Sequence, residues 1–389
     1  MLPIKQRTNL LVLRPRHRTE KSMACFTPAH IENAYQWLTR QRSHYPDNAD
    51  IWDLRFRWPQ AQERILSAVN TRSYVLSPLQ IVKKASGESV ALWSSSDALV
   101  LKMLTEMLET QLPVHPLCEH VRGHGGGRQS VLRVDRHFRE RRAPFVFRTD
   151  IKGYYANIDK NRLYTQLCWH VSHPVLLNLL WQFLNYSVEQ GGNFHTPRRG
   201  ISRGAALSPL LAAFHLYETD LHFEKHQPRV RYARYMDDFL ILAPTRWLLR
   251  RAVRDLKRLI VEYGFTLHPD KTQLGYTAQG FDWMGLWFKT GGMRTIAPRA
   301  VSKHRQQCRR LYEQIRNLSP HDQAARMAQY RRRWVRALVP PGPSFAVGRF
   351  ILPMPPRMTA ASLLCGTSWA HANHMRPAVI RQFLRVVKC

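Results

Sequence analysis

The sequence predicts an α+β fold, with an antiparallel sheet at its centre and helices packed around it. Three observations support this prediction. Residues 145–151 form a short apolar run that is typical of a buried strand. Two further apolar stretches, 230–235 and 239–243, flank a tight acidic turn and predict a β-hairpin. The amphipathic stretch 245–263 predicts a helix, and Gly264 follows it in the position that commonly ends one.

The remaining elements are predicted from apolar spacing and from end signals. Upstream, helical spacing covers residues 28–42, 60–70 and 97–112, and a glycine-rich loop occupies 120–127. We expect further helices over 161–170 and from Ser208 to about 223, where Pro209 suits a first helical turn. Short strands, including 281–288, precede a helix over 298–317. That last helix carries Arg299, Lys303, Arg305, Arg309, Arg310 and Arg316.

The charge balance indicates a polyanionic partner. The 389 residues contain 59 Lys and Arg against 27 Asp and Glu, a formal net charge of +32. Nucleic acid neutralises such a charge, and no apolar run approaches the roughly 20 residues of a membrane span. No secretory signal is evident at the amino terminus, and the six cysteines form no Cys-x-x-Cys pair, which is typical of free thiols in a reducing compartment. We therefore expect a cytoplasmic, nucleic-acid-binding protein without a membrane partner.

Three aspartates carry the predicted chemistry. Asp150 ends an apolar strand, and Asp237 and Asp238 lie in the hairpin turn. Adjacent carboxylates repel each other unless a cation is present. Two Mg²⁺ ions between such carboxylates stabilise the attacking and leaving oxygens of a phosphoryl transfer. The pattern predicts nucleotidyl transfer with two Mg²⁺ ions, for which Mn²⁺ is a substitute. The alternative is a polar turn beside a strand-end cap.

The residues around these aspartates form five motifs. The first is Asp150-Ile-Lys-Gly-Tyr-Tyr-Ala-Asn-Ile-Asp159, and the second is Gly200-Ile-Ser-Arg-Gly-Ala-Ala-Leu-Ser-Pro-Leu-Leu. Tyr-Met-Asp-Asp at 235–238 is the third, and segments 264–272 and 281–288 are the fourth and fifth. In this order the motifs resemble those of bacterial retroelement reverse transcriptases, such as the enzymes of group II introns and retrons.

The resemblance implies a right-hand polymerase and an RNA-directed DNA polymerase activity. Fingers and an N-terminal helical region would cover 28–144, the palm 145–292 and a helical thumb 293–340. A basic segment, 1–27, and a tail of unassigned role, 341–389, would flank them. The implied partners are an RNA template, a DNA or RNA primer and deoxynucleotides, with a dedicated structured non-coding RNA as a further candidate.

The family pattern also implies roles for single residues. Asp150, Ile151, Asp237 and Asp238 form the metal set, in which Asp150 and Asp237 bind both ions. Lys271 would act on the leaving pyrophosphate. Trp283, Met284 and Gly285 occupy the primer grip.

Substrate contacts are implied at a second group of positions. Tyr155 takes the place of the steric gate, a ring that excludes a 2′-hydroxyl, and Gly204 allows close approach to the template base pair. Two departures stand out. Arg203 replaces the usual Gln before that glycine, and the fingers hairpin lacks the usual arginine for the triphosphate, so Lys83 and Lys84 are the substitutes.

Several alternatives remain open from the sequence. His115, Cys118, His120 and His124 have a loosely zinc-like spacing, as do Cys365, His371 and His374 near the end. A viral RNA-dependent RNA polymerase is disfavoured by Tyr155. Template-independent or protein-primed DNA synthesis in phage defence is a rival function, and so is a non-catalytic RNA-binding maturase or scaffold. We expect neither an RNase H nor an endonuclease domain after the thumb.

Overall fold

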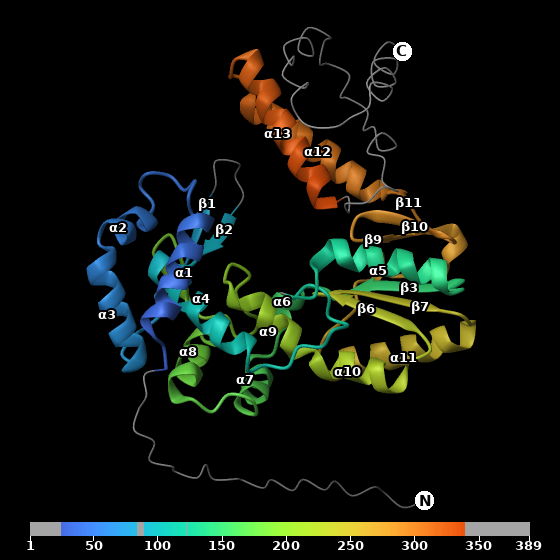
Figure 1. The fold of residues 1–389 in the computed structure, drawn as a ribbon, viewed down its shortest axis with the longest axis horizontal. Helices are drawn as coiled ribbons and strands as arrows, with labels where there is room; N and C mark the ends of the chain where they lie inside the picture. Colours follow the sequence, from blue (N-terminus) through green and yellow to red (C-terminus); the bar gives the residue numbers. More distant parts are fainter. Residues whose placement is uncertain (1–24, 84–88, 122, 339–389) are drawn as a thin grey trace, which may run out of the picture.

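The computed structural model describes residues 25–83, 89–121 and 123–338. Within this part of the chain the fold is α+β and has the right-hand arrangement of a polymerase, as predicted (Figure 1). Helices α1–α4 form one side, a central sheet lies beside them, and the pair α12–α13 rises above the sheet. No helix in the described residues is long and apolar enough to cross a membrane.

The central sheet has the strand order β6-β7-β3-β8, and each neighbouring pair is antiparallel. Its strands are β3 (Phe145–Asp150), β6 (Arg231–Tyr235), β7 (Asp238–Ala243) and β8 (Gln273–Tyr276). The first part of strand β3 is apolar at successive positions because hydrophobic side chains cover both faces of the strand. Val146 packs into one hydrophobic cluster and the adjacent Phe147, which points to the opposite face, packs into another. The predicted strands and hairpin are thereby confirmed.

Helices cover the two faces of this sheet (Figure 1). On one face lie α9 (Leu207–His215), α10 (Tyr217–His226) and α11 (Arg246–Glu262), and on the other lies α5 (Gly126–Glu140). The single helix predicted from Ser208 to about 223 is wrong. The helix is interrupted at Leu216, which is fully buried and has non-helical backbone angles (φ −104°, ψ 19°). Helix α10 therefore begins as a separate helix at Tyr217. Helix α5 was not predicted because its first residues, Gly126 and Gly127, are poor helix formers.

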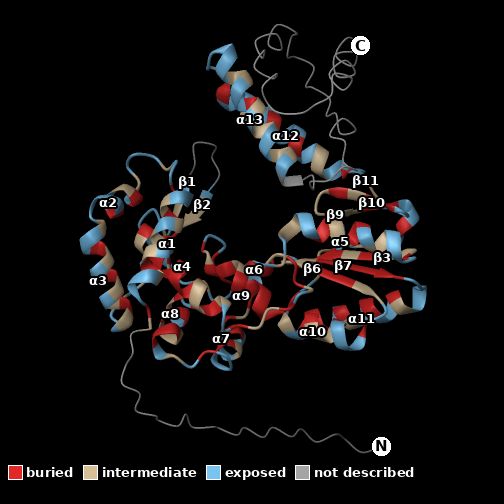
Figure 2. Ribbon diagram, viewed as in Figure 1, coloured by how far each residue is buried: buried red, intermediate tan, exposed pale blue. Residues whose placement is uncertain are grey.

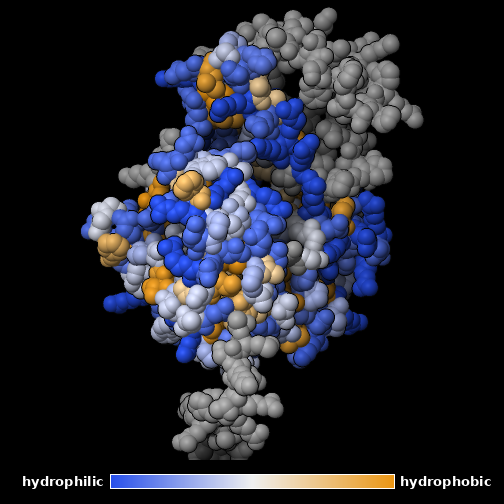
Figure 3. Space-filling view, turned by 60° about the vertical axis from the view of Figure 1, so that its left-hand side comes forward, coloured by the Kyte–Doolittle hydropathy of each residue, from blue (hydrophilic) through white to orange (hydrophobic). Residues whose placement is uncertain are grey.

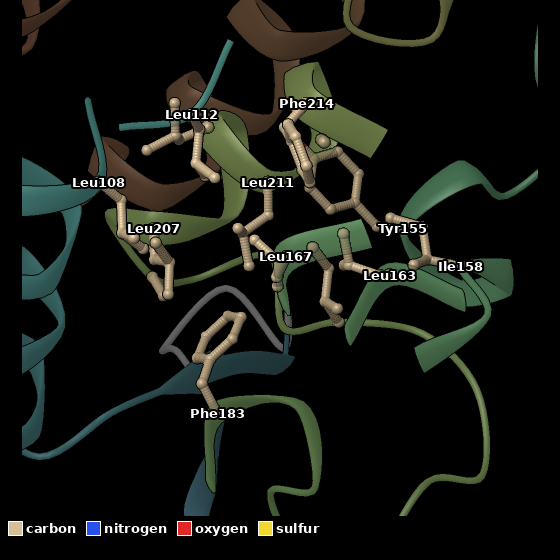
Figure 4. Close-up of a cluster of buried hydrophobic side chains, with 14 of the residues drawn as sticks. Leu108, Leu112, Tyr155, Ile158, Leu163, Leu167, Phe183, Leu207, Leu211 and Phe214 are labelled. Carbon is tan, nitrogen blue, oxygen red and sulfur yellow. The ribbon is translucent and has the colours of Figure 1, made fainter. Parts of the chain in front are cut away.

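Beside the central sheet, helices combine with a small second sheet of order β2-β1-β4-β5. The predicted helices correspond to α1 (Pro28–Gln41), α3 (Trp58–Asn70), α4 (Ser95–Glu109) and α7 (Lys160–Cys168). Elements outside that prediction are α2 (Asp50–Phe56), α6 (Tyr154–Asn157), α8 (Pro174–Leu184), β1 (Leu79–Lys83), β2 (Ser89–Leu92), β4 (Val188–Gln190) and β5 (Asn193–His195). Leucine and phenylalanine side chains from α4, α7, α8 and α9 pack together with Tyr155 of α6 in one core (Figure 4). This core joins helix α4 to the elements that follow strand β3 in the chain.

The C-terminal described part begins with a second small sheet. Two 3-10 helices, η1 (Pro269–Lys271) and η2 (Thr277–Gln279), precede β9 (Phe281–Trp283), β10 (Leu286–Lys289) and β11 (Gly292–Ile296). Helices α12 (Pro298–Ile315) and α13 (Pro320–Leu338) follow. All six basic residues predicted for this helix are exposed on α12 or just after it. Buried residues concentrate in the sheet and in α9, while the outer helical faces are exposed (Figure 2). The face that carries α1–α4 is mainly hydrophilic (Figure 3).

Candidate active site

Three aspartates meet at one edge of the central sheet, where β3 ends and the β6–β7 hairpin turns. Asp150 is the last residue of β3 and pairs with Asp238, the first residue of β7, while Asp237 lies in the turn. One oxygen from each carboxylate lies within 4.8 Å of the others. Among residues 25–83, 89–121 and 123–338, no other group of three or more His, Cys, Asp or Glu side chains is so arranged. The structure thus brings together the three aspartates that the sequence singled out.

The protein neutralises this acidic cluster only in part. Burial and then the charge of Asp150 raise the pKa of Asp237. Burial raises the pKa of Asp238 to about 6, although Arg148, whose Nη2 lies 3.4 Å from Asp238 Oδ1, acts in the opposite direction. The Nζ of Lys271 donates a hydrogen bond to Oδ2 of Asp150. Two cationic side chains therefore face three carboxylates, and the raised pKa values are typical of a site that favours a further positive charge.

The donor set fits a hard divalent cation. All three side chains offer carboxylate oxygens, which Mg²⁺ prefers, and Mg²⁺ usually completes its coordination with water and substrate phosphates. Ile151 differs from the other members of the predicted metal set. Its side chain is fully buried and carries no ligand atom, and its N–H donates to the carbonyl of Asp237 at 3.1 Å. A metal contact from Ile151 would therefore have to use its backbone carbonyl.

A backbone clamp holds the turn that carries Asp237. Met236, directly before it, has a left-handed conformation with φ 56°, which is unfavourable for a residue with a side chain. Its N–H donates to Nδ1 of His120 at 3.0 Å, and its carbonyl accepts from Nη1 of Arg234 at 3.2 Å. The Nε2 of His120 lies 3.1 Å from the carbonyl of Pro209 on α9. Since Nδ1 accepts, Nε2 carries the proton, and burial lowers the pKa of His120 to about 4, so the ring is neutral.

Arg234 is anchored by an ion pair inside the protein. Its guanidinium donates to both carboxylate oxygens of Asp220 on α10, at 2.5 Å for Nη2 and 2.8 Å for Nε, and neither side chain is exposed. The hydroxyl of Tyr232 donates to the same carboxylate at 2.7 Å, and the carbonyl of Ala213 accepts from Nη2 at 2.9 Å. Sequence reasoning missed this network. Arg234 and Arg148 stand within apolar stretches that predict buried strands. A buried charge needs a partner, so these two arginines could have indicated buried ion pairs.

The predicted gate residue lies beside the aspartates. Tyr155 is 9% exposed on α6, and burial followed by the charge of Asp237 raises its pKa to about 12. The guanidinium of Arg203 lies 5.6 Å from the centre of the Tyr155 ring. Gly204 has a different close neighbour from the one expected. A Cβ at this position would lie 2.7 Å from the carbonyl oxygen of Ala91 on β2, so the glycine is required by its contact with the β2-β1-β4-β5 sheet.

The predicted triphosphate contacts and the predicted primer grip lie in two other hairpins. Lys83 ends β1, where it pairs with Ser89, and Lys84 lies outside the described residues. In the hairpin of β9 and β10, Trp283 is fully buried and its Nε1 donates to Ser130 at 2.8 Å. Met284 and Gly285 form the turn, with φ values of 50° and 81°. A primer contact at this hairpin would come from that turn rather than from the Trp283 ring.

The zinc-like spacing does not produce a zinc site in the described residues. His115 lies 3.1 Å from Glu224, His120 bonds Met236 and Pro209, and Nδ1 of His124 lies 2.7 Å from the carbonyl of Cys118. These rings are used separately in structural hydrogen bonds. Cys365, His371 and His374 lie outside the described residues.

Comparisons with known proteins place the chain in a family. The profile of the reverse transcriptase (RNA-dependent DNA polymerase) family matches residues 93–288, which include all three aspartates. Protein YkfC of Escherichia coli strain K12 is 22% identical over 179 residues, covering 38% of this chain and 47% of YkfC. The Pol polyprotein of caprine arthritis encephalitis virus (strain Cork) is 34% identical over 86 residues, covering 22% of this chain and 8% of the polyprotein.

The chain therefore matches less than half the length of these two curated relatives. Among solved structures, a truncated apo telomerase from Candida tropicalis aligns with a TM-score of 0.44 and 13% identity, covering 56% of this chain and 55% of that one. Because the family profile spans half of the sequence, including the motifs around the acidic cluster, this chain belongs to the reverse transcriptase (RNA-dependent DNA polymerase) family.

Proposed function

We propose that this protein is an RNA-directed DNA polymerase that extends a 3′-hydroxyl with deoxynucleotides by two-metal nucleotidyl transfer. The main support is the convergence of Asp150, Asp237 and Asp238 within 4.8 Å in a chain of this family. The proposed partners are an RNA template, a DNA or RNA primer and deoxynucleotides, and the proposed location is the cytoplasm. Fingers, palm and thumb would follow the boundaries expected from the motifs.

The mechanism assigns each side chain a separate task. Asp150 and Asp237 would hold two Mg²⁺ ions and Asp238 would assist; bound there, the metal would supply stabilisation of the charge on the transferring phosphoryl group. Arg148 bonds Asp238 and keeps that carboxylate oriented at the first position of β7. Lys271 lies against Asp150, and from this position its ammonium group would neutralise or protonate the leaving pyrophosphate.

Selection for deoxynucleotides would depend on Tyr155. Its ring packs in the core that joins fingers and palm (Figure 4) and is therefore held in place next to the aspartates. A rigid ring under the sugar excludes a 2′-hydroxyl by steric clash. Arg203 lies over this ring, and it would contact a template phosphate or base from there. Lys83 and Lys84 as triphosphate contacts, and Met284–Gly285 as the primer-grip turn, complete the proposal.

Primer extension tests the proposal. Purified protein is given poly(rA)–oligo(dT), Mg²⁺ and either dTTP or UTP, next to Asp237→Asn, Tyr155→Ala and, as a matched control, Asp270→Asn, whose side chain is 88% exposed. We expect DNA synthesis by wild type and the control, none by Asp237→Asn, and UTP incorporation only by Tyr155→Ala. Synthesis that does not require the template would instead indicate a template-independent or protein-primed enzyme. RNA binding without any synthesis would favour a maturase or scaffold.

A further inference from the structure

A strongly basic depression lies at the end of the palm opposite the three aspartates. The carboxyl end of α5 and the beginning of β6 enclose a cavity of about 470 Å³. We propose that it binds the phosphate backbone of a structured RNA that is separate from the primer–template at the aspartates. This proposal is independent of the polymerase activity, because its readout is binding.

The lining of the depression suits an anion. Six arginines contribute to it against a single lining carboxylate, that of Glu140. The outer arginines Arg136, Arg141, Arg142 and Arg229 are exposed. A guanidinium presents a planar, forked set of donors that matches phosphate oxygens, and it stays charged at any physiological pH.

Two arginines of the inner wall are held in place by the buried carboxylate of Glu119. Glu119 is 1% exposed, and its Oε1 accepts from Arg231 at 2.8 Å and lies 3.4 Å from Arg133. One carboxylate thus orders two arginines and leaves the pair with excess positive charge. The Oε2 of Glu119 is buried without a hydrogen bond within the described residues, which shows how fully this carboxylate is enclosed. Burial lowers the pKa of Arg231 and the charge of Arg133 adds to this, although the charge of Glu119 acts in the opposite direction; a bound anion would offset the lowering.

The position of the depression separates its ligand from the reacting strands. Arg231 begins β6 and pairs with Leu242 near the end of β7, whereas Tyr235 and Asp238 close the hairpin at the aspartates. At about 3.3 Å per residue, the four steps from Arg231 to Tyr235 put roughly 13 Å between the two sites. A nucleic acid in the depression is therefore a second contact. Its concave shape and clustered arginines favour a phosphate backbone over the flat surface of a membrane.

Two charge-matched variants test the proposal. The first is Arg136→Gln with Arg141→Gln and Arg229→Gln, all exposed positions. The control is Arg250→Gln with Arg254→Gln and Lys257→Gln, which line a smaller depression of about 280 Å³ beside α11, across the sheet from α5 (Figure 1). Both variants lose three positive charges, so a general loss of charge affects them equally.

Binding of a labelled RNA stem–loop is measured by fluorescence anisotropy over a KCl series, with poly(rA)–oligo(dT) present in saturating amount. We expect the slope of log affinity against log salt to fall by about two in the depression variant, since each lost phosphate contact removes roughly 0.7–0.9, and by less than one in the control. Primer extension should be unchanged in both. An equal fall in both variants, or none in the first, overturns the proposal. So does loss of binding to phosphatidylserine vesicles with stem–loop binding intact.

Discussion

His120 is expected to control catalysis through the backbone of the turn, without touching substrate. The left-handed conformation of Met236 costs about 1–2 kcal/mol. The hydrogen bond from its N–H to His120 (3.0 Å) and the one from Arg234 to its carbonyl (3.2 Å) contribute about 1 kcal/mol or more each, so together they offset that cost. Removing the acceptor leaves the N–H without a partner and costs about 1–3 kcal/mol. The turn that carries Asp237 would then lose its defined position.

Two substitutions separate the two hydrogen bonds of the ring. Asn at position 120 keeps an acceptor near the Nδ1 position, which faces Met236, whereas Gln keeps an amide near the Nε2 position, which faces Pro209. We expect His120→Gln to lower kcat about tenfold, the equivalent of about 1.4 kcal/mol, and His120→Asn to stay within about threefold of wild type. The KM for dTTP should change little in either variant, because the turn does not hold the base. The Mg²⁺ concentration for half-maximal rate should rise in His120→Gln.

Steady-state primer extension with varied dTTP and varied Mg²⁺ measures these quantities. His124→Gln is the control from the same loop, since His124 bonds Cys118 and not the turn. Thermal unfolding of each variant shows whether the change in kcat follows stability. Equal losses of kcat in the Asn and Gln variants would refute the clamp, as would a loss that appears mainly in the KM for dTTP.

Three further predictions concern metal, the buried ion pair and pH. Asp237→Asn should raise the melting temperature of metal-free protein, because it removes carboxylate repulsion, yet abolish the stabilisation that Mg²⁺ gives to wild type in a thermal shift assay. Asp220→Ala should destabilise the protein by about 3–5 kcal/mol in urea unfolding, because Arg234 keeps an unpaired buried charge, and Asp220→Leu with Arg234→Met should recover much of this loss. Burial lowers the pKa of His215 to about 3, so the unfolded chain binds the extra proton below about pH 6.5. Stability should therefore fall as pH drops from 6.5 towards 3, and less steeply in His215→Phe by circular dichroism; an equally steep fall would exclude His215 as the cause.

Local patterns were sufficient for much of this protein. The apolar run before Asp150 and the two apolar stretches around Asp237 predicted three strands of the central sheet, because strands buried on both faces need such runs. The order of the motifs indicated the family, and the three aspartates were singled out as one site. A prediction failed at Leu216, where the apolar spacing of a helix continues through the residue. The sequence has no clear end signal there, yet the helix ends.

Residues close together in the chain were therefore enough to predict the central strands, the family and the three carboxylates. The support of these carboxylates depends instead on residues that are far apart in the chain. Met236 is held by His120, which lies 116 positions away in the sequence, and Arg234 is neutralised by Asp220 from a different helix. The basic depression likewise joins α5 to the beginning of β6. Such contacts depend on how separate elements pack. The spacing of residues along one element does not indicate which element packs against it.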